Sequence, residues 1–180
     1  MTPKQIVDFW LHDVGPARWY VKDSALDAEI AAKLGDLHEA ARDGRLDEWR
    51  NDAEGSLALL ILLDQVPRNI FRGDARAFAT DGRARDVAYD SVAAGYDIAI
   101  AGPMRIFFYL PFMHSENLND QNRSVELIAE RIGVDSENHA FALKHREVIA
   151  RFGRFPGRNA ALNRSSTSEE QAFLASNPGF

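Results

Sequence analysis

Three arginines lie close together between residues 151 and 159, in the order Arg-Phe-Gly-Arg-Phe-Pro-Gly-Arg-Asn. One arginine near a helix C-terminus is explained by the helix dipole, which contributes about 0.3–1 kcal/mol. Three arginines separated by Phe, Gly and Pro need another explanation. A turn stiffened by Pro156 can aim guanidinium groups in fixed directions and stack them on phenyl rings. We expect Arg151, Arg154 and Arg158 to recognise an anion, and a purely structural arginine network is the alternative.

His114 and Glu116 end the sequence Leu-Pro-Phe-Met-His-Ser-Glu, which follows an aromatic segment that we expect in the core. His-x-Glu is the zinc and general-base pair of nucleobase deaminases, but those sites also need cysteines, and this chain has none. Ser115 lies in no Gly-x-Ser-x-Gly sequence, so a hydrolase nucleophile is poorly supported. Ser115 and Glu116 can equally cap the next helix, and both interpretations stay open.

His145 lies on an apolar stripe of an expected helix, so we predict that it faces the interior. The other members of the stripe are Phe141, Val148, Ile149 and Phe152. His139 lies on a different face, so no His-Glu-x-x-His zinc motif is present. His114 and His145 are also the two histidines from which a metal site is conceivable. Asp64 or Glu116 would supply its carboxylate, but the absence of thiolates and of a close histidine pair leads us to expect no metal.

The polar sequence Asp-Gln-Val-Pro-Arg-Asn at residues 64–69 follows a wholly apolar stretch at residues 57–63. A helix that is apolar all round is buried all round, so we expect residues 57–63 to be the most buried segment. Polar groups at its end then need partners, and Asp64 and Arg68 are spaced to satisfy each other. Pro67 should kink or end the helix, because proline removes a donor and clashes with the preceding turn.

Charge is spread unevenly along the 180 residues, whose formal net charge is −6. Residues 144–164 contain six basic side chains and one acidic one, so a basic segment lies within an acidic protein. The overall negative charge argues against broad binding to nucleic acids or anionic membranes. We expect a cytoplasmic protein, because cysteine is absent, no signal peptide is visible and the apolar stretches are far shorter than the roughly 20 residues of a membrane span.

Apolar residues recur at helical spacing through the chain, and no segment alternates as a strand would. Capping boxes begin helices at Thr2 and at Thr167, each followed three residues later by Gln or Glu. Glycines such as Gly153 mark helix ends. With 46% hydrophobic and 27% charged residues, the composition is that of a globular protein. We predict a single all-α domain over residues 1–180, with about eight antiparallel helices joined by short loops.

Long blocks of the sequence carry a family resemblance. They are Trp10, Leu-Leu-Ile-Leu-Leu-Asp-Gln-Val-Pro-Arg-Asn-Ile-Phe-Arg-Gly at 59–73, Tyr-Leu-Pro-Phe-Met-His-Ser-Glu at 109–116, and Arg-Phe-Gly-Arg-Phe-Pro with Arg-Asn between 151 and 159. Together they resemble a bacterial family of unknown function, domain of unknown function nine-two-four, over nearly the whole chain. The resemblance implies a tetratricopeptide-like, all-helical array and no established activity. Gly157 stands where the family usually has histidine, and Asn163 where it usually has glycine.

The leading functional hypothesis is a pocket that binds a small anionic metabolite or a peptide carboxylate. Arginines would bind the anion, a histidine would tune the proton balance, and Glu116 or Asp64 would orient them. Two or three charge-assisted hydrogen bonds of about 1.5–3 kcal/mol each would give useful affinity. The candidate ligand-binding residues are Arg68, Asn69, His114, Glu116, His145, Arg151, Arg154, Arg158 and Asn159.

Two other functions stay open. An interaction scaffold of tetratricopeptide type would bind a partner segment on a concave helical surface. An acid–base or metal-assisted hydrolase would use His114, Glu116 and His145. Whether the protein is an enzyme therefore stays open, and so does its oligomeric state. We expect no cofactor, no nucleic acid and no membrane, which leaves a small anionic ligand or a peptide as the partner.

Overall fold

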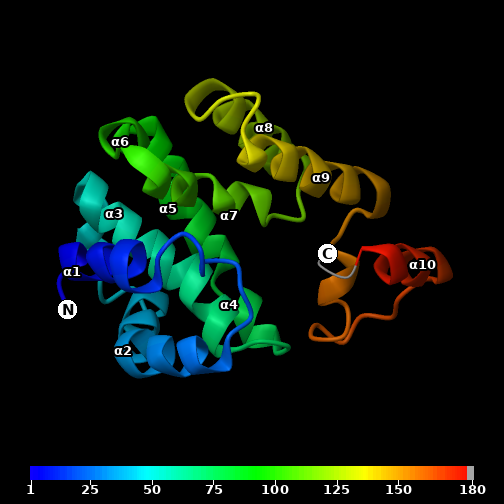
Figure 1. The fold of residues 1–180 in the computed structure, drawn as a ribbon, viewed down its shortest axis with the longest axis horizontal. Helices are drawn as coiled ribbons and strands as arrows, with labels where there is room; N and C mark the ends of the chain where they lie inside the picture. Colours follow the sequence, from blue (N-terminus) through cyan, green and yellow to red (C-terminus); the bar gives the residue numbers. More distant parts are fainter. Residues whose placement is uncertain (178–180) are drawn as a thin grey trace. The chain divides into compact units, whose positions relative to one another are not determined.

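Helices occupy the positions that the apolar spacing predicts (Figure 1). The computed structural model describes residues 1–177, and 72% of the chain is helical, with no strand in the described part. This confirms the all-α prediction. The α-helices are α1 (Pro3–Asp8), α2 (Ser24–Arg42), α3 (Ala53–Leu60), α4 (Val66–Ile70), α5 (Asp81–Ala93), α6 (Tyr96–Ala99), α7 (Leu110–Met113), α8 (Leu118–Arg131), α9 (Glu137–Phe152) and α10 (Ser168–Ser176). The π-helices are η1 (Phe9–Val14) and η3 (Ile61–Gln65), and the 3-10 helices are η2 (Asp47–Asn51), η4 (Ala75–Phe78), η5 (Gly102–Phe108) and η6 (Pro156–Arg158).

Contacts between residues divide the chain into two compact units. The N-terminal unit comprises Met1–Arg72 and Arg76–Pro111, and the C-terminal unit comprises Gly73–Ala75 and Phe112–Phe180. Each unit has buried apolar side chains of its own. The single domain expected over the whole chain stays a prediction, and so does the tetratricopeptide-like arrangement.

The buried centre of the N-terminal unit is α3 together with its continuation η3. All seven side chains of residues 57–63 are 1% exposed or less, as expected for a helix that is apolar on every side. Helix α3 contacts α1 and α5, and η3 contacts α2. Trp10 and Phe107 pack edge to face in the same unit, with ring centroids 6.2 Å apart. The core therefore surrounds the most apolar stretch of the sequence.

Pro67 widens the helix at η3 and does not end it. Because Pro67 has no N–H, the carbonyl of Leu63 loses its helical partner, and it accepts a hydrogen bond from Thr80 Oγ1 at 2.5 Å instead. The N–H just before the proline reaches back five residues. The carbonyl of Leu62 is thereby released as well, and it accepts from His38 Nδ1 at 2.8 Å. Both carbonyls thus gain partners from other helices, and the chain continues as α4.

In the C-terminal unit, α8 and α9 lie along each other and are joined by a short loop (Figure 1). Ser136 caps α9, because its Oγ accepts a hydrogen bond from the His139 N–H at 3.2 Å. Gly153, with a φ of 69°, ends α9 as predicted. A small apolar core then connects α9 to the turn and to α10; it consists of Val148, Ile149 and Phe155, with Phe152 and Phe173 packed against it.

The face of α9 that packs inward differs from the predicted stripe. Phe141 is 52% exposed and His145 is half-buried, whereas Ala142, Val148 and Ile149 are buried. Ala142 and Ile149 lie two turns apart on one helix face, and Phe141 falls beside that line. The prediction that Phe141 and His145 face the interior together is therefore wrong for Phe141, because the buried line of α9 runs through the small Ala142.

Asn163 is the one non-glycine residue with a positive φ in residues 1–177, at 53°. The left-handed conformation costs most residues roughly 1–2 kcal/mol, and asparagine tolerates it better. It lets the chain turn back so that the Arg164 N–H donates to the carbonyl of Asn159 at 2.8 Å. The position at which the resembling family usually has glycine therefore requires a conformation that glycine adopts readily.

Candidate functional site

Seven of the nine candidate residues lie in the C-terminal unit: His114, Glu116, His145, Arg151, Arg154, Arg158 and Asn159. Arg68 and Asn69 belong to the N-terminal unit, where they have partners of their own. Arg68 donates to Asp81 Oδ1 at 2.7 Å and lies 3.7 Å from Asp64 Oδ1, which confirms the expected pairing with Asp64. Asn69 Oδ1 accepts from Arg72 at 2.9 Å. These contacts account structurally for both residues.

Glu116 connects the start of α8 to the turn after α9. Its Oε1 accepts from the backbone N–H of Phe155 at 2.8 Å, and Arg164 donates to its two carboxylate oxygens at 2.7 and 2.9 Å. Burial by itself would raise the pKa of Glu116. The hydrogen bonds from Arg164 and Phe155 outweigh burial and hold the pKa below its ordinary 4.5. Glu116 is therefore a carboxylate at neutral pH with a structural role.

Arg154 and Asn159 share one buried carboxylate, that of Glu170. Arg154 donates to both oxygens of Glu170, at 2.7 and 2.9 Å, and Asn159 Nδ2 donates at 3.3 Å. The Arg154 guanidinium and the Thr167 N–H hold the pKa of Glu170 at about 2. Because Arg164 Nε also donates to Asn159 Oδ1 at 2.9 Å, the contacts of Glu116 and Glu170 join into one system. We name it the carboxylate–arginine network; its members are Glu116, Arg154, Asn159, Arg164 and Glu170.

Arg151 also has a carboxylate partner, Glu169 at the start of α10. Its Nε and one terminal nitrogen donate to Glu169 Oε1 at 2.9 and 2.7 Å. Its guanidinium lies over the Phe152 ring, 4.7 Å from the centroid. Sequence reasoning missed Arg164, Glu169 and Glu170 as members of the site. The signal was present in the two acids that follow Thr167, because carboxylates are the usual partners of a nearby arginine cluster.

Arg158 and two histidines form a second group, which we name the His–Arg cluster: His114, His145, Arg158 and Phe155. Arg158 donates to the backbone carbonyl of His114 at 2.8 Å, and its guanidinium lies 4.5 Å from the centroid of the Phe155 ring. The ring centroids of His114 and His145 are 6.5 Å apart, and those of His145 and Phe155 are 5.6 Å apart. The fold thus brings the predicted histidines beside the third arginine of the turn.

His145 is neutral at physiological pH. Burial is the main cause that lowers its pKa to about 4; the electrostatic effects of His114 and Arg158 act in the same direction, and the hydrogen bond to Phe141 opposes them. That hydrogen bond joins Nδ1 to the carbonyl of Phe141 at 2.8 Å. Since a carbonyl oxygen only accepts, Nδ1 carries the proton and Nε2 carries the lone pair. The acceptor nitrogen of this imidazole is therefore Nε2.

A cavity of about 400 Å³ lies between α9 and α10 of the C-terminal unit. Its lining residues are Lys144, Glu147, Val148, Arg151, Phe173 and Asn177. A volume of this size is within the roughly 300–1,000 Å³ of small-molecule sites. Of the candidate residues, only Arg151 lines it.

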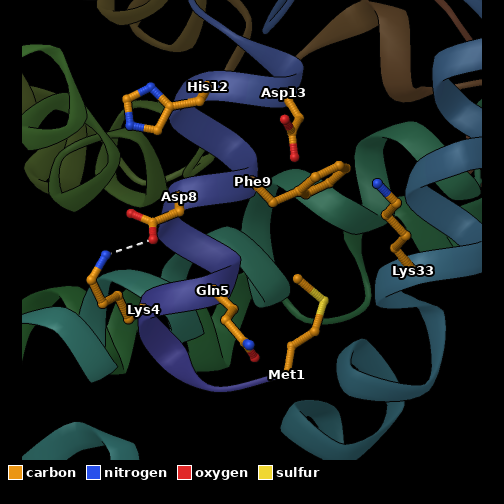
Figure 2. A pocket seen from close by; sticks show the side chains of 8 residues that line it. All are labelled: Met1, Lys4, Gln5, Asp8, Phe9, His12, Asp13 and Lys33. Carbon is orange, nitrogen blue, oxygen red and sulfur yellow. Dashed lines mark hydrogen bonds and ion pairs between the residues drawn. The ribbon is translucent and has the colours of Figure 1, made fainter.

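The N-terminal unit has a hollow of about 670 Å³ between α1, η1 and α2 (Figure 2). It is lined by Met1, Lys4, Gln5, Asp8, Phe9, His12, Asp13 and Lys33, and none of the candidate residues is among them. Lys4 forms an ion pair with Asp8 at 2.6 Å, and Lys33 pairs with Glu29 at 2.9 Å. The ammonium of Lys33 also lies 4.5 Å from the centroid of the Phe9 ring. Both lysines are thus engaged within the protein.

Two features are absent from residues 1–177. No three His, Asp or Glu side chains are grouped so that they could hold a metal ion. No helix in the same range combines the length and apolar character that crossing a membrane requires.

Comparisons with known proteins place the chain among bacterial relatives. The model of the family described as "Bacterial protein of unknown function (DUF924)" matches residues 6–178. A solved structure, that of the protein of unknown function ATU0120 from Agrobacterium tumefaciens, is 43% identical in sequence. The structural match covers 97% of this chain and 97% of that chain, with a TM-score of 0.91. The two proteins therefore have the same all-helical fold. No match was found among functionally curated proteins.

Proposed function

The chain belongs to the DUF924 family of bacterial proteins of unknown function, and we propose that its C-terminal unit binds a small anionic ligand at the His–Arg cluster. The observation that carries the proposal is the setting of Arg158. The His114 carbonyl and the Phe155 ring hold its guanidinium in one direction. A guanidinium fixed in this way presents a planar fork that matches a carboxylate or phosphate group.

The electrostatics of the cluster support an anionic ligand. Burial is the largest influence on the pKa of both Glu116 and His145, and the positive charge of Arg158 is the smallest of the influences that lower these two pKa values. His145 itself stays uncharged near pH 7. The ligand class that fits is a small molecule with one carboxylate or phosphate group.

The carboxylate–arginine network supports the site indirectly. Arg154 and Arg164 are both bound to carboxylates of the same unit, and so is Arg151 through Glu169. In our proposal these arginines, with Asn159, hold the turn that carries Arg158. A pKa of about 4 makes His145 a weak base near neutral pH, which weighs against a hydrolase that would use it as general base.

Ligand-dependent stability tests the proposal on the full chain. Phosphate or succinate should raise the melting temperature with concentration, beyond the effect of chloride at equal ionic strength. Arg158→Lys keeps the charge but loses the planar fork, so it should remove most of this response with little change in stability without ligand. Arg146→Lys, in the same unit but outside the cluster, is the matched control and should respond as wild type.

Two results would refute the proposal. One is an equal thermal shift for all salts. The other is an Arg158→Lys protein that is strongly destabilised without anions, which would make Arg158 another structural arginine of the turn.

A further inference from the structure

The cavity between α9 and α10 has an organised lining that the proposed anion site does not use. Lys144, Glu147, Val148 and Arg151 are spaced three or four residues apart and therefore lie along one face of α9. Phe173 of α10 and Asn177, which follows that helix, also line the cavity and are four residues apart. None of the six belongs to the His–Arg cluster. The cavity is thus a separate place for a ligand of about 400 Å³ or less.

Lys144 and Glu147 bring opposite charges to this cavity, and neither forms an ion pair within residues 1–177. Lys144 precedes Glu147 on the helix, which is the less favourable order for a pair of this kind. Glu147 is four residues before Arg151, the favourable spacing, but Arg151 is held by Glu169 at 2.7 Å. The ammonium of Lys144 has a weaker contact, 5.3 Å from the centroid of the Phe141 ring. Both charges therefore remain exposed at the cavity.

Two of the lining residues, Val148 and Phe173, are apolar. Val148 is 5% exposed and belongs to the small core of the C-terminal unit, and Phe173 packs against that core. Arg151, in the last turn of α9, is neutralised by Glu169 of α10. The lining consequently offers one cation, one anion and an apolar surface between two helices.

We propose that this cavity binds a small zwitterion, namely a free α-amino acid with an apolar side chain. The ligand carboxylate would meet the ammonium of Lys144, and the ligand ammonium would meet the carboxylate of Glu147. These two residues are one helical turn apart, about 5–6 Å between Cβ atoms, and an α-amino acid carries its two charges within that span. The ligand side chain would lie on Val148 and Phe173, where burying apolar surface adds affinity.

This chemistry sets a strict order of ligands. L-leucine and L-phenylalanine carry both charges and an apolar side chain, so they should bind. N-acetyl-L-leucine lacks the ammonium, L-leucinamide lacks the carboxylate, and glycine lacks the side chain. Each should bind about tenfold more weakly or worse, because each loses one charge-assisted contact or the apolar contact.

Calorimetric titration of the full chain tests the proposal, with backbone amide shifts locating the ligand on α9 and α10. Lys144→Gln and Glu147→Gln should each weaken L-leucine binding about tenfold or more. Both side chains are exposed, so neither change should unfold the protein. Arg146→Gln and Glu126→Gln remove the same charges elsewhere in the C-terminal unit and should leave binding unchanged.

The proposal is overturned if L-leucine and L-phenylalanine fail to bind wild-type protein at their solubility limits. It is also overturned if Lys144→Gln and Glu147→Gln bind as wild type does, or if N-acetyl-L-leucine binds as tightly as L-leucine. An anion response at Arg158 with no amino-acid binding would leave the proposed function standing and reject this second site alone.

Discussion

Acid should destabilise the protein through His145. Its pKa is about 4 in the folded chain, against an ordinary 6.5, so between these values the unfolded state binds a proton that the folded state does not. The stabilising contribution of the neutral ring is therefore complete above pH 6.5 and is lost as the pH falls from 6.5 toward 4. This difference in the pKa of His145 between the folded and the unfolded chain corresponds to roughly 3 kcal/mol of unfolding free energy. That is a large share of the roughly 5–15 kcal/mol of a typical domain.

Urea unfolding at a series of pH values above 4.5 measures this contribution. In that range Glu170 is mostly charged both in the folded chain, where its pKa is about 2, and in the unfolded chain, where its ordinary pKa is 4.5, so its titration adds little to that of His145. The wild-type unfolding free energy should fall by about 2–3 kcal/mol between pH 7 and pH 4.5. His145→Gln, which cannot titrate, should lose most of this slope, and His139→Gln in the same helix should keep it. Equal slopes for wild type and His145→Gln would refute the reasoning, as would a ring pKa at or above 6.5 by NMR.

Two further experiments test the packing and the carboxylate–arginine network. Leu60→Ala truncates a side chain that is 1% exposed in the centre of the N-terminal unit. It should lower the free energy of unfolding, measured with denaturant, by about 2–5 kcal/mol. A loss below about half a kcal/mol would mean that α3 does not form the core. A double-mutant cycle of Glu116→Ala and Arg164→Ala should give a coupling of about 1–3 kcal/mol, between the values for exposed and buried ion pairs, because both side chains are roughly three-quarters buried. Strictly additive effects of the two substitutions would contradict the direct contact.

Local signals in the sequence determined the helices well. Both predicted capping boxes are present, with Thr2 bonded to Gln5 and Thr167 bonded to Glu170. Gly153 ends α9 at the predicted place. These features depend on atoms within three or four residues of one another, so neighbouring residue types are enough to predict them. The burial of residues 57–63 follows for a related reason, because a stretch without polar side chains has no face that favours water.

Packing between helices was harder to predict. The pattern of α9 was interpreted as an inward stripe through Phe141, yet Phe141 is 52% exposed and Ala142 is buried. A rotation of the helix by about one residue position, roughly 100°, separates the two outcomes. Apolar periodicity indicates which side of a helix is more apolar on average. The shape of the neighbouring helix then decides which side chains fit against it.

Residue types and their spacing were enough to predict a basic, arginine-rich turn, with two histidines and Glu116 near apolar segments. Which of the arginines are neutralised depends on contacts that form only in the folded chain. Arg164 pairs with Glu116 across 48 residues of sequence, and Arg154 pairs with Glu170 across 16. Ion pairing depends on the distance and burial of two groups in space, and neither quantity follows from their separation along the chain. For that reason the sequence indicated an anion site, whereas the fold placed Arg158 between His114 and Phe155.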